Sequence, residues 1–227
     1  MKYALLIILS ILTYPVFAQK TPYIQWQEAA KQDIRLLPKY GNQPKTEEQQ
    51  KADEILVKDY LAQAGTHRKA SELLIKLGFN YLYKNDPKTA MFRFNQAWIL
   101  DPNNENVFWG FGGVYSTLGD FDNALVQYED GLKINPKSSN IITDKATIFM
   151  TMYMKSGKRE NINAAIKLFN QSHNIDPKNQ NTLFKMSVCY YLIDDCTNAK
   201  KHYLECKKLG GKPITTEYTN ALNEKCR

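Results

Sequence analysis

The fold is decided by two consecutive stretches, SELLIKLGFNYLYKNDPKTAMFRFNQAWILDPNN (residues 71–104) and ENVFWGFGGVYSTLGDFDNALVQYEDGLKINPKS (residues 105–138). Aligned at a spacing of 34 residues, they match in kind at Leu77 and Phe111, Gly78 and Gly112, Tyr81 and Tyr115, Ala90 and Ala124, Phe94 and Tyr128, Ala97 and Gly131, and Pro102 and Pro136. Two further copies follow, marked by Ala146, Phe149, Ala165, Phe169, Ser172 and Pro177, then by Ser187, Tyr190, Ala199, Tyr203 and Cys206. The pattern therefore predicts a repeat protein.

Each repeat is predicted to contain two closely packed helices. Gly78 and Tyr81 on the first helix meet Ala90, Phe94 and Ala97 on the second, so small residues lie opposite aromatic ones. A residue followed by proline ends the second helix, because the position before proline disfavours the α conformation. One such pair cannot bury its apolar face alone, so neighbouring pairs must stack.

This order of small, aromatic, alanine, aromatic, small and proline positions resembles the tetratricopeptide repeat, whose period is also about 34 residues. The resemblance covers residues 71–213. It implies an all-α fold, a right-handed superhelical solenoid of about four helix pairs with capping helices at both ends. The predicted segments are an N-terminal arm and capping helix (19–69), four repeats (71–104, 105–138, 139–179 and 180–213) and a C-terminal capping helix (214–227).

The third repeat contains an insertion of seven residues. The small-residue markers of the first helices are at 78, 112, 146 and 187, whereas the alanines of the second helices are at 90, 124, 165 and 199. Seven residues make about two helical turns. We expect the first helix of this repeat to extend towards Met154, followed by a projecting basic loop over residues 155–161.

The N-terminus has the pattern of a secretory signal peptide. Lys2 precedes an apolar run over residues 3–17, and Val16, Phe17 and Ala18 form a small-x-small cleavage site. The run is shorter than the roughly 20 residues of a membrane span. We expect cleavage after Ala18 and export to the periplasm or the exterior; an uncleaved anchor is the alternative. Loss of Lys2 would change the formal charge from +7 to +6.

Between the cleavage site and the repeats, the sequence predicts two helices. A short one spans residues 24–37 and ends at Pro38, although residues 19–45 as a mobile arm remain an open alternative. Thr46 and Gln49 form a capping box that opens a second helix to about Ala62, closed by Gly65. This second helix is a candidate to shield the first repeat.

All four cysteines lie at the C-terminal end. In an oxidising compartment, clustered cysteines indicate disulfides. Cys189 and Cys196 would be about 10 Å apart along a helix, too far to bridge. A last helix over about 215–225 brings Cys226 towards Cys196, so that pair is the preferred disulfide. Cys189 and Cys206 are left as either bridged or free buried thiols.

The sequence contains no recognisable catalytic cluster. His67, His173 and His202 sit at unrelated phases of the repeat, so we expect surface residues and no metal site. The glycines at 110, 112 and 113 resemble a phosphate-binding loop in composition only, because they fall inside a predicted helix with no strand before it. We therefore predict a protein that is not an enzyme and that needs no cofactor. An unrecognised enzyme is the weakest alternative.

The resemblance implies that partners bind on a concave face formed by the first helix of each repeat. Counting repeat positions places on this face Phe79, Tyr83, Trp109, Gly113, Ser116, Thr147, Met150, Phe184 and Tyr191. This groove is predicted to be aromatic and neutral. Ile75, Phe79 and Leu82 occupy the places of the basic residues that clamp a C-terminal carboxylate in chaperone-binding members, so such a clamp is disfavoured.

Exposed aromatic residues are typical anchors of protein interfaces. The favoured function is a scaffold or adaptor that binds an extended or helical segment of another exported protein. The alternatives are that the N-terminal arm or neighbouring helices cover these rings, or that the rings stack on glycan or peptidoglycan fragments. Nucleic acid is not an expected partner, because no run of five basic residues occurs.

Overall fold

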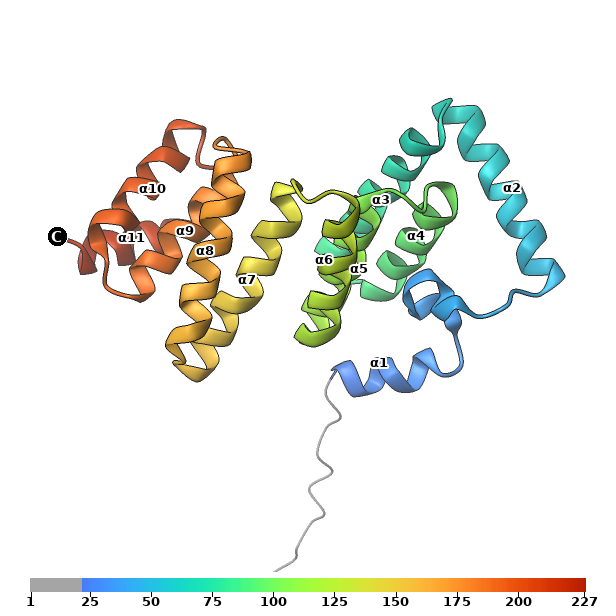
Figure 1. Ribbon diagram of the computed structural model, residues 1–227, viewed down its shortest axis with the longest axis horizontal. Helices are drawn as coiled ribbons and strands as arrows, with labels where there is room; N and C mark the ends of the chain where they lie inside the picture. Colours follow the sequence, from blue (N-terminus) through green and yellow to red (C-terminus); the bar gives the residue numbers. More distant parts are fainter. Residues whose placement is uncertain (1–21) are drawn as a thin grey trace, which may run out of the picture.

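The computed structural model describes residues 22–227, and the predicted signal peptide, residues 1–18, lies outside this range. Within the described residues the chain is all-α (Figure 1). The helices are α1 (Pro22–Ala30), two 3-10 helices η1 (Ile34–Leu36) and η2 (Pro38–Asn42), α2 (Glu47–Ala64), α3 (His67–Tyr83), α4 (Pro87–Leu100), α5 (Glu105–Leu118), α6 (Phe121–Ile134), α7 (Ser139–Ser156), α8 (Arg159–Ile175), α9 (Gln180–Leu192), α10 (Cys196–Lys208) and α11 (Thr216–Lys225).

Four helix pairs, α3–α4, α5–α6, α7–α8 and α9–α10, follow one another along the long axis of the molecule, with α2 at one end and α11 at the other (Figure 1). We call the first helix of each pair the A helix and the second the B helix. The predicted all-α solenoid is confirmed. Residues 22–227 contain no helix that combines the length and the apolar character required to cross a membrane.

Three of the four B helices begin at an aspartate that caps them. The carboxylates of Asp86, Asp120 and Asp195 each accept a bond from the backbone N–H three residues later, at 3.0 to 3.2 Å. These bonds satisfy backbone donors that a helix start leaves unpaired. The third repeat differs, because α8 follows Lys158, which makes no such side-chain bond.

The helices approach closely where glycine faces an aromatic ring. A Cβ added to Gly78 would lie 2.5 Å from the Phe94 ring, and one added to Gly110 would lie 2.3 Å from the same ring. A Cβ on Gly112 would lie 2.2 Å from Tyr128. Phe94 is fully buried. A glycine inside a helix costs about 1 kcal/mol of stability relative to alanine. These positions nevertheless require glycine, because only a residue without a Cβ leaves room for the rings.

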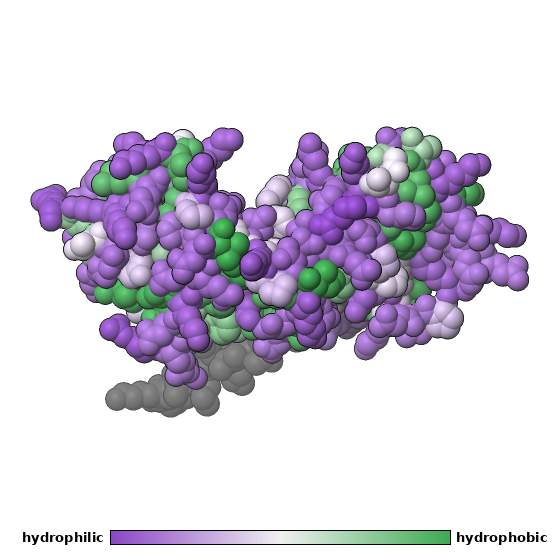
Figure 2. All heavy atoms as spheres, turned by 45° about the horizontal axis from the view of Figure 1, so that its top comes forward, coloured by the Kyte–Doolittle hydropathy of each residue, from purple (hydrophilic) through white to green (hydrophobic). Residues whose placement is uncertain are grey.

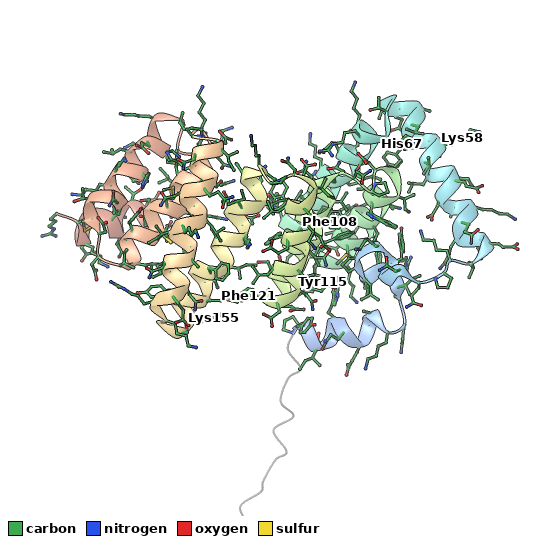
Figure 3. The ribbon with its side chains drawn as sticks, in the orientation of Figure 1. Lys58, His67, Phe108, Tyr115, Phe121 and Lys155 are labelled. Carbon is green, nitrogen blue, oxygen red and sulfur yellow. A yellow bond between two sulfur atoms is a disulfide. The ribbon has the colours of Figure 1, made fainter. Side chains whose placement is uncertain are left out.

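The insertion in the third repeat lengthens two helices. α7 has 18 residues and α8 has 17, whereas α5 and α6 have 14 each. The predicted extension of the A helix is confirmed, but the predicted loop over 155–161 is wrong. Only Gly157 and Lys158 connect the helices, because Gly157 (φ 68°) ends α7 and α8 starts at Arg159. Lys155 at the end of α7 lies over the Phe121 ring of α6, with Nζ 4.6 Å from its centroid (Figure 3).

The predicted helix over residues 24–37 is also wrong in extent, because α1 ends at Ala30 and the chain then turns through η1 and η2. The reason is a fully buried side chain on α4. Asn95 Nδ2 donates to the carbonyl oxygens of Arg35 (2.8 Å) and Leu37 (2.9 Å), so these carbonyls face α4. Trp26 is buried as well. From residue 22 onward the arm is therefore packed on the repeats.

The helix after the arm begins as predicted. Gln49 N–H donates to Thr46 Oγ1 and Thr46 N–H donates to Gln49 Oε1, which confirms the capping box. α2 contacts α3 and α4, yet none of its residues is fully buried. Ile55 on its outer side is 61% exposed. α2 thus covers the first repeat on one side only.

We expect Gly110→Ala to destabilise the protein by about 2 to 3 kcal/mol, because the added methyl collides with the buried Phe94 ring. Gly113→Ala in the same helix is the matched control. Its Cβ would lie 3.2 Å from the end of the Leu82 side chain and 3.8 Å from the Phe79 ring, so its stability should stay within about 1 kcal/mol of wild type. Urea unfolding followed by circular dichroism measures both. Equal stabilities of the two variants would contradict the packing described here.

Candidate functional site: the face of the A helices

A chain of side-chain contacts crosses all four A helices. The rings of Phe79 (α3) and Trp109 (α5) lie with centroids 4.3 Å apart. Trp109 Nε1 donates to Asp144 Oδ2 on α7 at 2.7 Å, and Lys185 Nζ on α9 donates to Asp144 Oδ1 at 3.0 Å. These four residues therefore share one face of the solenoid. We keep the word groove, taken from the sequence prediction, only as a name for this face of the A helices.

The open part of the groove lies at the first two repeats. Tyr83 is 80% exposed, and its ring stacks on Phe79 with centroids 6.2 Å apart. Phe79 in turn packs edge-on against the buried Phe94. Gly113 lies beside Phe79, and a Cβ there would be 3.8 Å from that ring. Phe79, Tyr83 and Trp109 thus form an aromatic shelf on a rigid base, and we use that name for these three residues.

The groove contains an ion pair that the prediction of an aromatic, neutral groove did not include. Asp144 and Lys185 form an ion pair whose side chains are 31% and 24% exposed. Because two carboxylate oxygens accept from two different donors, Asp144 fixes the orientation of the Trp109 indole. Counting positions in single repeats missed this pair, since Trp109, Asp144 and Lys185 come from three successive repeats. The sequence did contain a signal for this ion pair, because Asp144 and Lys185 occupy the same position in two successive repeats.

Register counting also placed buried residues in the groove. Met150 is only 8% exposed and packs in the core with Ile162 and Phe169, so it offers little surface to a partner. α7 packs on both the second and the fourth repeats. Thr147 is half-buried and donates to its own helix at Thr143 O, 2.8 Å. Ser116 is half-buried.

At the fourth repeat the chain covers its own groove residues. Tyr218 of α11 contacts Phe184 and Tyr191, with ring centroids 5.3 and 5.8 Å apart. Its hydroxyl bonds to Ser187 Oγ at 2.6 Å. Lys225 Nζ lies 4.3 Å from the Tyr191 centroid. Phe184 and Tyr191 therefore serve to dock α11, and they do not join the aromatic shelf.

A disulfide joins Cys196, the first residue of α10, to Cys226 at the end of α11, with their Cα atoms 5.3 Å apart. This is the pairing that the sequence favoured. Cys189 and Cys206 are free and buried. Burial raises the pKa of the Cys189 thiol to about 12 and also raises the pKa of Cys206, so both stay protonated at neutral pH.

The histidine prediction is wrong for two of the three residues. His202 is 5% exposed, and the rings of His173 and His202 meet with centroids 6.0 Å apart. They differ in repeat phase but lie on neighbouring B helices, so the stacking of repeats brings them together. Burial lowers the pKa of His202, whose Nδ1 bonds to Glu205 Oε2 at 3.1 Å. Within residues 22–227 no group of three or more metal-ligating side chains is present.

A family model described as a tetratricopeptide repeat matches residues 107–138, which span α5, α6 and the turn after them. This match falls on the repeat whose helices pack through Gly112 and Tyr128. The chain is a tetratricopeptide repeat protein. Repeats of this family typically form scaffolds for protein–protein interaction and are typically not catalytic.

Two curated proteins are similar in sequence to this tetratricopeptide repeat protein. The general transcriptional corepressor trfA of Dictyostelium discoideum is 29% identical over 100 residues, which are 44% of this chain and 7% of the corepressor. An uncharacterized protein of Haemophilus influenzae is 23% identical over 146 residues, covering 64% of this chain and 79% of that protein. The chain thus spans only a small part of the corepressor.

Among solved structures, a thermophilic tetratricopeptide repeat protein of Thermus thermophilus has a TM-score of 0.58 at 16% identity, covering 68% of this chain and 80% of that one. PilF of Pseudomonas aeruginosa has a TM-score of 0.54 at 14% identity, with 63% and 62% coverage. A chain of the Cut9–Hcn1 hetero-tetramer has a TM-score of 0.54 at 15% identity, with 87% and 37% coverage. These likenesses concern the fold.

Reduction of the Cys196–Cys226 disulfide should release α11. The bond closes a loop of 30 residues, and a loop of this length contributes about 3 to 4 kcal/mol in the chain-entropy account. Limited proteolysis should cut the last 20 or so residues of the reduced protein faster. Cys196→Ser/Cys226→Ser should behave like reduced wild type and show no response to reductant. Unchanged protease resistance of that double variant would show that packing alone holds α11.

Proposed function

We propose that the protein is an exported scaffold without catalytic activity, which binds a segment of another exported protein in the groove. The observation that carries this proposal is the aromatic shelf. Tyr83 is 80% exposed next to Phe79 and Trp109, although large aromatic rings are normally buried. A shelf of this kind gains binding free energy when a partner removes it from water.

The shelf is preorganised. Trp109 is fixed by Asp144, which is itself held by Lys185, and Phe79 rests on the buried Phe94. A partner that docks here therefore loses little entropy to the ordering of these side chains. Its segment needs an apolar or aromatic side chain to lie against Tyr83 and Trp109, and polar groups to meet the ion pair beside them.

The arm is a poor competitor for the shelf. Its 3-10 helices η1 and η2 pack on the B helix α4, where Asn95 holds Arg35 and Leu37 by their backbone oxygens. Its helix α1 lies near Asn123 of α6, whose Nδ2 donates to Tyr23 at 3.2 Å. The arm also reaches α5, where Lys39 Nζ lies 5.6 Å from the centroid of the Phe108 ring. None of these contacts involves Phe79, Tyr83 or Trp109, so they leave the shelf available to another molecule.

Two features support the exported part of the proposal. The first is the signal-peptide pattern over residues 1–18. The second is the Cys196–Cys226 disulfide, since disulfides persist mainly in oxidising compartments. Both are consistent with the periplasm or the exterior as the place where the partner is met.

The proposal predicts that Tyr83→Ala weakens partner binding about tenfold or more, the effect of losing an interface anchor. The partner is first identified by a photoreactive residue at position 83 in native cells, with the same residue at position 126 on α6 as control. Affinity is then measured with the purified partner for Tyr83→Ala, Trp109→Ala and the control Val126→Ala, whose side chain is 53% exposed on a B helix. Equal affinities for Tyr83→Ala and Val126→Ala would reject the shelf as the binding site.

Glycan binding is tested on the same rings. Glycan and peptidoglycan fragments are titrated while tryptophan fluorescence is recorded for wild type and Trp109→Phe, because the chain has three tryptophans. No saturable change is expected with sugar alone. A saturable change that disappears in Trp109→Phe would make the shelf a glycan site instead.

A further inference from the structure

The outward face of α10 has an unusual composition. Lys200, Lys201, Lys207 and Lys208 surround Leu204, and all five residues are exposed. At 100° per residue they fall within an arc of about 120° centred on Leu204. Leu204 itself is 53% exposed. We call this arc the basic face. The opposite side of α10 carries Ala199, His202, Tyr203 and Cys206, which are buried, so the basic face points away from the solenoid core.

These lysines have no carboxylate partner among the ion pairs of the described residues. The one acidic residue between them in sequence, Glu205, bonds to His202, and at 100° per residue it lies about 40° outside the arc on the side of Lys201. Lys207 Nζ lies 5.9 Å from the centroid of the Tyr203 ring, but in the described part of the chain none of the four ammonium groups is neutralised by a carboxylate, so they can meet an external anion. Figure 2 shows apolar patches among hydrophilic side chains on the lobe that holds α8 to α11.

A second B helix provides an internal comparison. On α6, Val126 is also 53% exposed at the centre of an outward arc. Its neighbours, however, are Asp122, Asn123, Glu129, Asp130 and Lys133, and Lys133 is paired with Asp130 at 2.7 Å. The two arcs have the same geometry and opposite charge. Because both arcs have an exposed apolar residue at the centre, the excess of lysine is the feature of α10 that needs its own explanation.

The basic face continues into a hollow of about 350 Å³ next to the C-terminal end of α10. Apolar groups of Pro177, Leu183 and Leu209 line it, together with Lys178, Lys208, His173 and one acidic residue, Glu205. Leu209 is 37% exposed. Apolar side chains with ammonium groups around them suit the boundary of a lipid bilayer, where leucine enters the acyl region and lysine reaches the phosphates.

We propose that the basic face of α10 binds the surface of a membrane that contains anionic phospholipids. An anionic bilayer fits better than an acidic peptide, because the charges cover one outward helix face with the exposed Leu204 at its centre. Binding should be reversible, since one helix face offers only a few apolar side chains for insertion. The proposal does not depend on the function of the groove.

The test uses the full chain and vesicles of phosphatidylcholine alone or with about one third phosphatidylglycerol. The apolar run over residues 3–17 can bind both kinds of vesicle, so the readout is the ratio of the two affinities. Near an anionic surface each lysine contributes a factor of about five. We expect Lys200→Gln/Lys201→Gln/Lys207→Gln/Lys208→Gln to lower this ratio at least about tenfold, and high salt to do the same in wild type.

The matched control removes four exposed lysines at the other end of the molecule. They are Lys51 and Lys58 on α2, and Lys69 and Lys76 on α3; Lys58 is labelled in Figure 3. This variant has the same net charge as the first but should keep the wild-type ratio. An equal loss in both variants would overturn the proposal, because net charge alone would then account for binding.

Two further measurements distinguish an anionic membrane from an acidic polypeptide as the ligand of the basic face. Leu204→Gln should weaken binding to anionic vesicles several-fold with an unchanged melting temperature, since the side chain is exposed; Val126→Gln on α6 should have no effect on binding. Polyglutamate is added as a competitor. The membrane proposal fails if polyglutamate displaces the vesicles completely and binds the protein as tightly as they do. It also fails if Leu204→Gln binds anionic vesicles like wild type. In either case the basic face is a site for acidic polypeptide.

Discussion

The whole solenoid depends on aromatic rings placed where a neighbouring helix has no Cβ. Phe94 occupies the space left by Gly78 on the A helix of its own repeat and by Gly110 on the A helix of the next. One ring therefore sets two distances, the one between the helices of a pair and the one between successive pairs. Because an aromatic ring in a close-packed core cannot yield to a methyl group, these two distances are not independently adjustable.

The spacing set by Phe94 determines the groove. With α3 and α5 this close, Phe79 is brought onto Trp109, and the Trp109 indole can reach Asp144 on α7. α7 also joins two parts of the core: its Ile141 and Ile148 pack with the first two repeats, while Ala146 and Met150 pack with the helices that follow. The groove contacts thus cross the boundary between separately packed parts, and they help to hold the two parts in one orientation.

The sequence predicted contacts within a repeat better than contacts between repeats. The period of 34 residues reports which positions meet inside one helix pair, so Gly78 opposite Phe94 and the register of the helices could be read from it. His173 and His202 were misplaced because their contact joins different phases of two B helices. Asp144 was missed because its two partners lie in the repeats before and after its own, and Asn95 because its partners are backbone oxygens of the arm, which no side-chain pattern records.

The aromatic residues of the A-helix face have different roles at the two ends of the molecule. At one end they pack against α11, and at the other Tyr83 is exposed. At the fourth repeat, Phe184 and Tyr191 dock α11, and the disulfide fixes that helix to the start of α10. The A-helix face is thereby closed at this end, while Tyr83 keeps it open at the other. The same closure holds α10 with its buried residues inward and its lysines outward. Since the lysines lie on a B helix and the aromatic shelf on A helices, contact of α10 with a surface leaves the shelf free to hold a partner.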